Sequence, residues 1–164
     1  MTESQREPVP RPDGSELEVA LAFLGFVRSS VLKKTSGLDE QQLRRPGVPS
    51  GTSLLGLVHH LTGCERYWFG YHLRLDVPEE SADMAMEAPR SASVAQVLEA
   101  YRTAIAESDQ RIREIDDPAA PMARAVDGRQ LPLRWVLAHM TGETARHAGH
   151  ADILREMVDG VTGR

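Results

Sequence analysis

The sequence contains a single cysteine, Cys64, and this scarcity bears on the compartment of the protein. One cysteine cannot form an intramolecular disulfide, whereas small proteins of oxidising compartments commonly contain such bonds. The first residues also lack the basic start and the apolar run of a secretory signal peptide. These absences predict a cytoplasmic protein.

Long apolar runs and concentrated positive charge are missing as well. No segment approaches the roughly 20 apolar residues that a membrane-spanning helix requires. The formal net charge is -5, and no basic cluster is longer than a pair such as Arg44-Arg45. Proteins that bind nucleic acid usually carry a concentrated basic surface. We therefore predict that neither a membrane nor a nucleic acid is a partner.

The remaining composition is that of a globular protein, with 41% hydrophobic and 26% charged residues. A chain of 164 residues is long enough for one domain with a substantial core. Residues 1–14 are rich in proline and have few side chains that could pack. We predict that they form a flexible tail and that residues 15–164 form a single domain.

Four long segments repeat apolar residues at helical spacing and are bounded by helix start and stop signals. The predicted helices cover about 15–35, 52–73, 93–115 and 132–158. Strand signals are confined to short pieces around residues 125–130, too little for a sheet. The sequence therefore predicts an all-α protein, with a four-helix bundle as its architecture.

Ionisable side chains are concentrated on one face of the last predicted helix. Four residues along an α-helix rotate a side chain by only about 40°. The face carries His139, Glu143, His147 and His150, together with Val136, Met140, Leu154 and Met157. Because apolar residues lie on the same face as these ionisable side chains, we predict that this face points inward. Buried imidazoles and carboxylates require compensation, which a metal ion would provide.

A further histidine of the second predicted helix, His60, lies on an apolar and aromatic face. Residues near it on the helical wheel are Leu57, Cys64, Tyr67, Trp68 and Tyr71, while His59 is rotated by about 100° and His72 is more peripheral. His60 could supply a third ligand beside Glu143 and His147. Alternatively, His60 is a core histidine and the other two are a buried hydrogen-bonded pair.

A His–Glu–His set with open positions is typical of catalytic zinc sites, whereas structural zinc sites close all four positions. Nickel, iron or manganese could take the same ligands. The metalloprotease motif His-Glu-x-x-His is absent. His139 and His150 could ligate, bind substrate or reach solvent. Cys64 fits a buried apolar cysteine better than a reactive thiol.

Two motifs resemble those of the DinB/YfiT-like metal-binding four-helix bundles. They are Leu57-Val-His59-His60-Leu61 and Glu143-x-x-x-His147-x-Gly149-His150. The ending from Ala145 to Gly160 resembles an uncharacterised actinobacterial branch, and the resemblance covers about Ser15 to Gly160. It implies that His60, Glu143 and His147 hold one divalent metal ion, most readily zinc. It also implies up-down-down-up helices with a long crossover supplied by Val77 to Ala92, and a homodimer.

The resemblance also implies a function. With glutamate at position 143, the motif resembles that of the mycothiol-dependent maleylpyruvate isomerases, which have glutamate at the same place. Characterised relatives use a low-molecular-weight thiol such as mycothiol or bacillithiol. A metal-bound thiolate would then attack a small-molecule substrate, which Tyr67, Tyr71, His139 or His150 could orient or protonate. Three hypotheses stay open: a thiol-using transferase or isomerase, a metal-dependent hydrolase, and a non-catalytic, stress-related metal- or ligand-binding bundle.

Overall fold

A computed structural model describes residues 8–162, and its regular structure over this range is helical. The α-helices in this range are α1 (Glu16–Lys33), α2 (Glu40–Arg44), α3 (Leu54–Glu65), α4 (Val94–Ile115) and α5 (Leu133–Asp159). Residues 8–162 contain no strand beyond two isolated β-bridges. The all-α prediction is confirmed. Residues 1–7 of the predicted tail lie outside the described range.

The helix ends follow local capping chemistry. Ser15 and Ser93 form capping boxes at α1 and α4, and the Ser53 hydroxyl accepts a hydrogen bond from the Gly56 amide at the start of α3. Gly160 ends α5 at φ 75°, a left-handed conformation that glycine adopts without strain. The predicted boundaries of the four long helices therefore agree with the structure to within a few residues, except at the end of α3.

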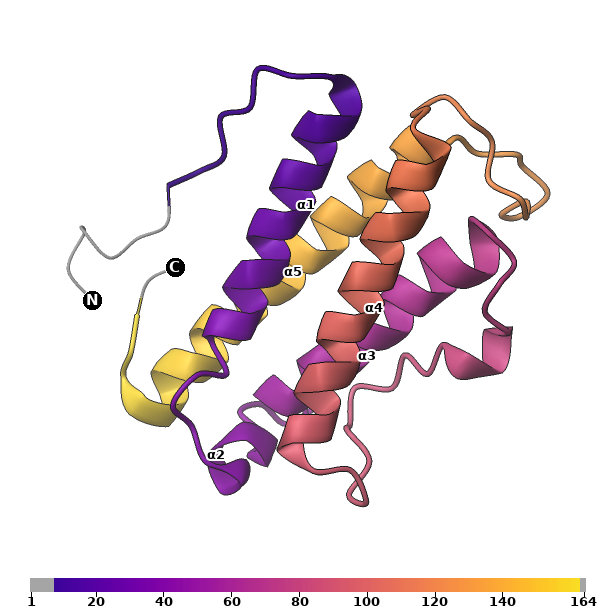
Figure 1. Ribbon diagram of the computed structural model, residues 1–164. Coiled ribbons are helices and arrows are strands. Elements are labelled where there is room, and N and C mark those ends of the chain that lie inside the picture. The colour runs from indigo at the N-terminus through magenta and orange to yellow at the C-terminus, as the bar shows by residue number, and fades with distance from the viewer. Residues whose placement is uncertain (1–7, 163–164) are drawn as a thin grey trace.

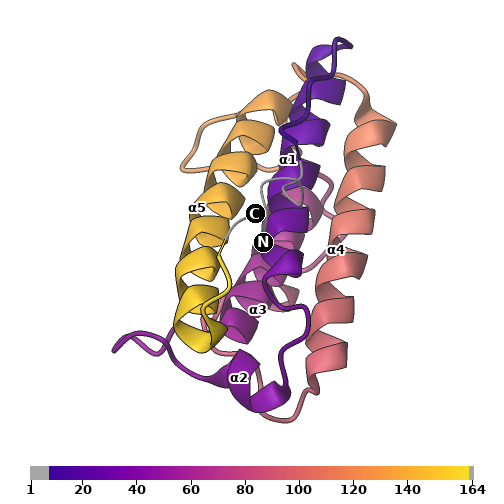
Figure 2. The ribbon, with the colours of Figure 1, turned by 90° about the vertical axis from the view of Figure 1, so that its left-hand side faces the viewer.

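The four long helices lie side by side (Figures 1 and 2). Helix α1 packs chiefly on α5, and α3 packs on both α4 and α5. In Figure 1 the chain descends along α1, ascends along α3 and then α4, and descends along α5. The segment between α3 and α4 returns the chain to the other end of the bundle and includes the short 3-10 helix η3 (Glu79–Ser81). Among the described residues, no helix has the length and apolar character needed to cross a membrane.

The prediction that α3 continues to Leu73 requires a correction in its second half. From Arg66 to His72 the helix widens into a π-helical segment, η2, in which the Leu73 amide donates to the Trp68 carbonyl. The wider turn changes the rotation per residue, so a helical wheel drawn from His60 fails here. His72, expected at the periphery, is buried, whereas Tyr67 and Tyr71 are only partly buried.

Met157 also differs from its predicted inward position, because 55% of its surface is exposed. Val136, Met140 and Leu154 are buried as predicted. At this end of α5 the helix is covered by the loop at Gly47, and Leu154 occupies the contact with that loop. The sulfur of Met157 reaches only the edge of the same loop, so most of its side chain faces solvent.

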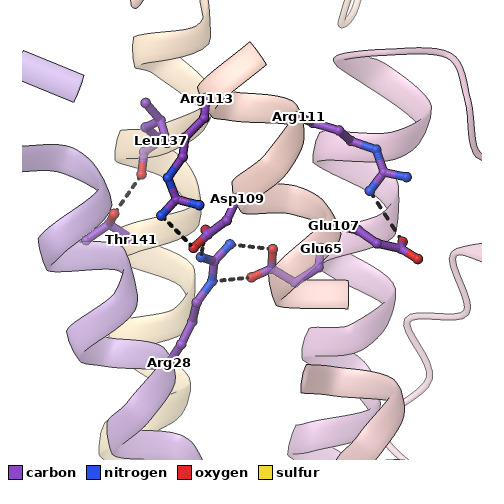
Figure 3. A network of polar contacts seen from close by, with 8 residues as sticks. All are labelled: Arg28, Glu65, Glu107, Asp109, Arg111, Arg113, Leu137 and Thr141. Atoms are coloured by element: carbon purple, nitrogen blue, oxygen red, sulfur yellow. Dashed lines mark hydrogen bonds and ion pairs between the residues drawn. The ribbon is translucent and has the colours of Figure 1, made fainter. Parts of the chain in front are cut away.

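The sequence did not reveal a buried ion network at the centre of the bundle (Figure 3). Arg28 of α1 is 2% exposed and forms two hydrogen bonds with Glu65 of α3, at 2.8 and 2.6 Å. A third bond, at 2.7 Å, joins Arg28 to Asp109 of α4. This bidentate geometry satisfies the guanidinium away from water and links three helices.

Candidate metal centre

Three potential ligand atoms converge where α3 packs against α5. His60 comes from α3, and Glu143 and His147 lie one turn apart on α5, with all three atoms within 4.8 Å of one another. Oε1 of Glu143 lies 2.9 Å from Nε2 of His147 and 3.6 Å from Nε2 of His60. The side chains are 8–15% exposed. The structure thus brings together the three residues that the sequence singled out, at a largely buried site.

Backbone contact fixes the orientation of His60. Its Nδ1–H donates a hydrogen bond of 2.7 Å to the carbonyl oxygen of Met84, which can only accept. In the neutral imidazole this leaves the lone pair on Nε2, the atom that faces Glu143. An imidazole that donates through one nitrogen and ligates through the other is the usual arrangement at metal sites.

The surroundings of Glu143 and His147 lower the pKa of both side chains. Burial alone raises the pKa of Glu143, but the hydrogen bond from His147 and the nearby charge of Arg146 outweigh burial and lower it. Burial lowers the pKa of His147, and the hydrogen bond to Glu143 only partly opposes this effect. Near pH 7 the pair consists of a carboxylate and a neutral imidazole.

Cys64 lies beside the cluster but is protected from ionisation. Its Sγ is 3.4 Å from Nε2 of His60, and the residue is buried, as predicted. Burial, reinforced by the negative charges of Glu143 and Glu65, raises the thiol pKa to about 12. The protein's own thiol therefore stays protonated near neutral pH and is a poor nucleophile.

An open pocket of about 400 Å³ adjoins the cluster on the side of His147. Its polar lining includes His150, whose Nδ1 lies 3.4 Å from Nδ1 of His147. The other lining residues are mostly apolar: Val48, Ser50, Thr52, Met86, Ile153 and Leu154. Such a pocket suits a small, largely apolar molecule placed next to the ligand atoms.

His139 and the two tyrosines belong to a neighbouring aromatic group. His139 stacks on Trp135 at 5.1 Å and contacts Trp68 at 4.7 Å, one turn before Glu143 on α5. Tyr67 and Tyr71 stack on each other at 5.6 Å in η2. Within residues 8–162, His139, Tyr67 and Tyr71 form no hydrogen bond or ring contact with the three potential ligands. Their roles in substrate binding therefore stay predictions.

The sequence alone does not indicate two parts of the site. The Met84 carbonyl is a backbone group, and nothing in the residue type marks it as an acceptor. Val48 and Thr52, which line the pocket, come from the loop before α3 and carry no periodic pattern. Only the tertiary arrangement brings these groups to the cluster.

The donor set fits a divalent ion. Two imidazole nitrogens and one carboxylate oxygen suit zinc, nickel, iron or manganese. The described residues place three such atoms together, fewer than the four that close a structural zinc site. The arrangement could therefore hold an ion with at least one position open to an exogenous ligand.

The family model described as mycothiol-S-transferase matches residues 19–160, a range that includes both helices of the cluster. No curated protein matches the chain.

Proposed function

Because this chain belongs to the mycothiol-S-transferase family, a DinB-like family, we propose that it is a divalent-metal-dependent transferase that uses a low-molecular-weight thiol. The predicted resemblance to DinB/YfiT-like proteins is thereby confirmed. The observation that carries the proposal is the convergence of His60, Glu143 and His147 within 4.8 Å inside the matched range.

In this proposal, His60, Glu143 and His147 hold the metal. The ion, when bound, would coordinate the sulfur of the thiol and lower the thiol pKa. Glu143 would contribute a negative charge to the ligand set, and the hydrogen bond to Met84 would leave Nε2 of the neutral His60 imidazole free to bind the ion. Arg146 pairs with the second oxygen of Glu143.

The chain's other residues would handle the proton and the acceptor. His150 is exposed, lines the pocket and is the best-placed imidazole to accept the proton that the thiol loses. The apolar walls formed by Met86, Ile153 and Leu154 would bind the electrophilic acceptor and exclude water from it. The thiol sulfur would form a bond to the acceptor's electrophilic carbon as the bond from that carbon to its leaving group breaks. The leaving group would depart with the electron pair of the broken bond and take up the proton held by His150.

The proposal extends to the helix arrangement, the compartment and the oligomeric state of the protein. We assign the bundle to the up-down-down-up arrangement of DinB/YfiT proteins, with Val77 to Ala92 as the crossover. We place the protein in the cytoplasm, since a single cysteine fits a reducing compartment. We expect a homodimer and a small-molecule substrate.

The test begins with the metal content of the purified, untagged protein by mass spectrometry, before and after chelation. We expect about one equivalent of a divalent metal. Loss of the mycothiol thiol group is then followed in the presence of an electrophilic acceptor, and we expect a rate that depends on the protein and on metal. Metal-dependent ester or amide hydrolysis without thiol would instead favour the hydrolase hypothesis. Metal binding with neither activity would favour a non-catalytic bundle.

A further inference from the structure

The 83–86 segment of the crossover lies directly on the face of α3 that carries His60. A Cβ added at Gly63 would lie 2.1 Å from the carbonyl oxygen of Asp83, and one at Gly56 would lie 2.1 Å from that of Met86. Both distances are far below van der Waals contact, and the opposing atoms belong to the backbone. Only glycine therefore lets the segment approach this closely at both positions.

Gly56 and Gly63 are seven residues apart, nearly two helical turns, so they share one face of α3. Glycine is unfavourable inside a helix because it loses much conformational freedom on folding. Helix stability therefore does not explain these two glycines. The contact with the 83–86 segment does.

Side-chain contacts hold the same segment between the two glycines. His60 donates to the Met84 carbonyl at 2.7 Å. His59 Nε2 lies 3.1 Å from Oδ2 of Asp83, and Oδ1 of Asp83 accepts a hydrogen bond of 3.0 Å from the Ala85 amide. The Met84 carbonyl is thus fixed from both sides.

From these contacts we infer that the 83–86 segment is a backbone clamp for His60 and that Gly63 and Gly56 are positioning residues of the metal centre. A neutral imidazole can carry its proton on either nitrogen. The Met84 carbonyl selects the Nδ1–H form, which leaves Nε2 free toward Glu143. The inference rests on the proposed metal site for its effect on affinity, but its effect on the imidazole is measurable in metal-free protein.

The experiment compares Gly63→Ala and Gly56→Ala with the matched control Gly25→Ala. Gly25 lies in α1, and a Cβ there would meet nothing within 4 Å. Metal-free, 15N-labelled protein is studied by NMR at a pH where His60 is neutral, and the His60 signals are assigned from their loss in His60→Gln. We expect the Nδ1–H form in the wild type and in Gly25→Ala, and a mixture of forms in the two clamp variants.

Zinc affinity, measured by competition with a chelator, is the second readout. We expect about tenfold or greater weakening in Gly63→Ala and no change in Gly25→Ala, since groups that orient a ligand typically affect affinity by about 10–100-fold. Asp83→Ala serves if Gly63→Ala does not fold, because it leaves α3 intact and removes only the contacts that shape the segment. It should give a mixed tautomer and a several-fold weaker affinity.

A folded Gly63→Ala or Asp83→Ala protein with the Nδ1–H form of His60 and wild-type zinc affinity would overturn the clamp. A wild type that binds no zinc would contradict the proposed function instead. In that case the NMR comparison alone still decides whether the segment controls the imidazole.

Discussion

Among the residues of the cluster, the ligand variants give the most direct prediction. We expect His60→Ala, Glu143→Ala and His147→Ala each to lower metal content sharply, because each substitution removes one of the three donor atoms that converge at the site. Inductively coupled plasma mass spectrometry of the purified variants measures the change. His59→Ala is the control, since its ring faces Asp83 and should leave occupancy unchanged at saturating metal. Wild-type metal content in His60→Ala would reject the three-ligand site.

Buried His72 predicts a pH-dependent stability. Burial is the largest cause of its lowered pKa, so the unfolded chain binds more protons than the folded protein between the two pKa values. The contribution of His72 to the free energy of unfolding should therefore be complete above about pH 6.5 and decrease as the pH falls below it.

His72→Phe isolates this effect, because phenylalanine keeps a ring among Tyr67, Trp68 and Tyr71 but cannot be protonated. Urea denaturation of both proteins between pH 5 and pH 8 makes the comparison. We expect the wild type to lose more stability than His72→Phe toward pH 5. Parallel pH profiles would show that His72 titrates alike in the folded and unfolded states.

At the scale of helices, most helix boundaries were predictable from the sequence, but the change to π-helical geometry after α3 was not. Ser15, Ser53 and Gly160 are local capping signals, and each acts within one turn of its own position. The π-helical segment η2 has no comparable local signal. Its change of rotation placed His72 inside the protein, whereas a regular helix extended from His60 predicts a peripheral position.

The ion network of Arg28 should stabilise the packing of α1 against its neighbouring helices. Arg28→Ala should lower the free energy of unfolding by about 3–5 kcal/mol, because Glu65 would remain buried without its partner. Arg102→Ala is the matched control, since the Arg102–Glu99 pair is exposed on α4 and should contribute less than about 1 kcal/mol. Urea denaturation measures both.

Arg28→Met combined with Glu65→Leu should recover much of that loss, because two apolar side chains of similar size leave no unpaired charge at their positions. Equal destabilisation by Arg28→Ala and Arg102→Ala would show that water reaches Glu65. The sequence could not indicate this network, since an arginine among apolar residues of a helix is more often exposed. Its partners come from helices far along the chain.

For the whole molecule, the candidate site was predictable as a set of ligands but not as a cavity. The spacing of Glu143 and His147 fixes two donors on one face of α5, and His60 is the inward histidine of a second helix. The clamp at Met84 and the pocket beside His147 depend on how the crossover and the loop before α3 fold back. These segments lack periodicity, so their positions follow only from the assembled bundle.

An exposed apolar group on α5 suits an interface between two copies of the chain. Ile153 and Met157 lie one turn apart on α5 and are 59% and 55% exposed, and Val48, 39% exposed, lies with Ile153 at the pocket. Apolar side chains grouped in this way lower the free energy of association when a second copy covers them. We expect the homodimer to use this face, so that the partner lies beside the pocket.

Sedimentation velocity over a range of concentrations tests this assembly. The wild type should sediment as a dimer, and Ile153→Glu as a monomer, because a buried charge without a partner opposes association. Leu75→Glu is the control, since Leu75 is 52% exposed after η2, away from the pocket beside His147. A dimer that persists in Ile153→Glu would place the interface elsewhere, and a monomeric wild type would contradict the dimer itself.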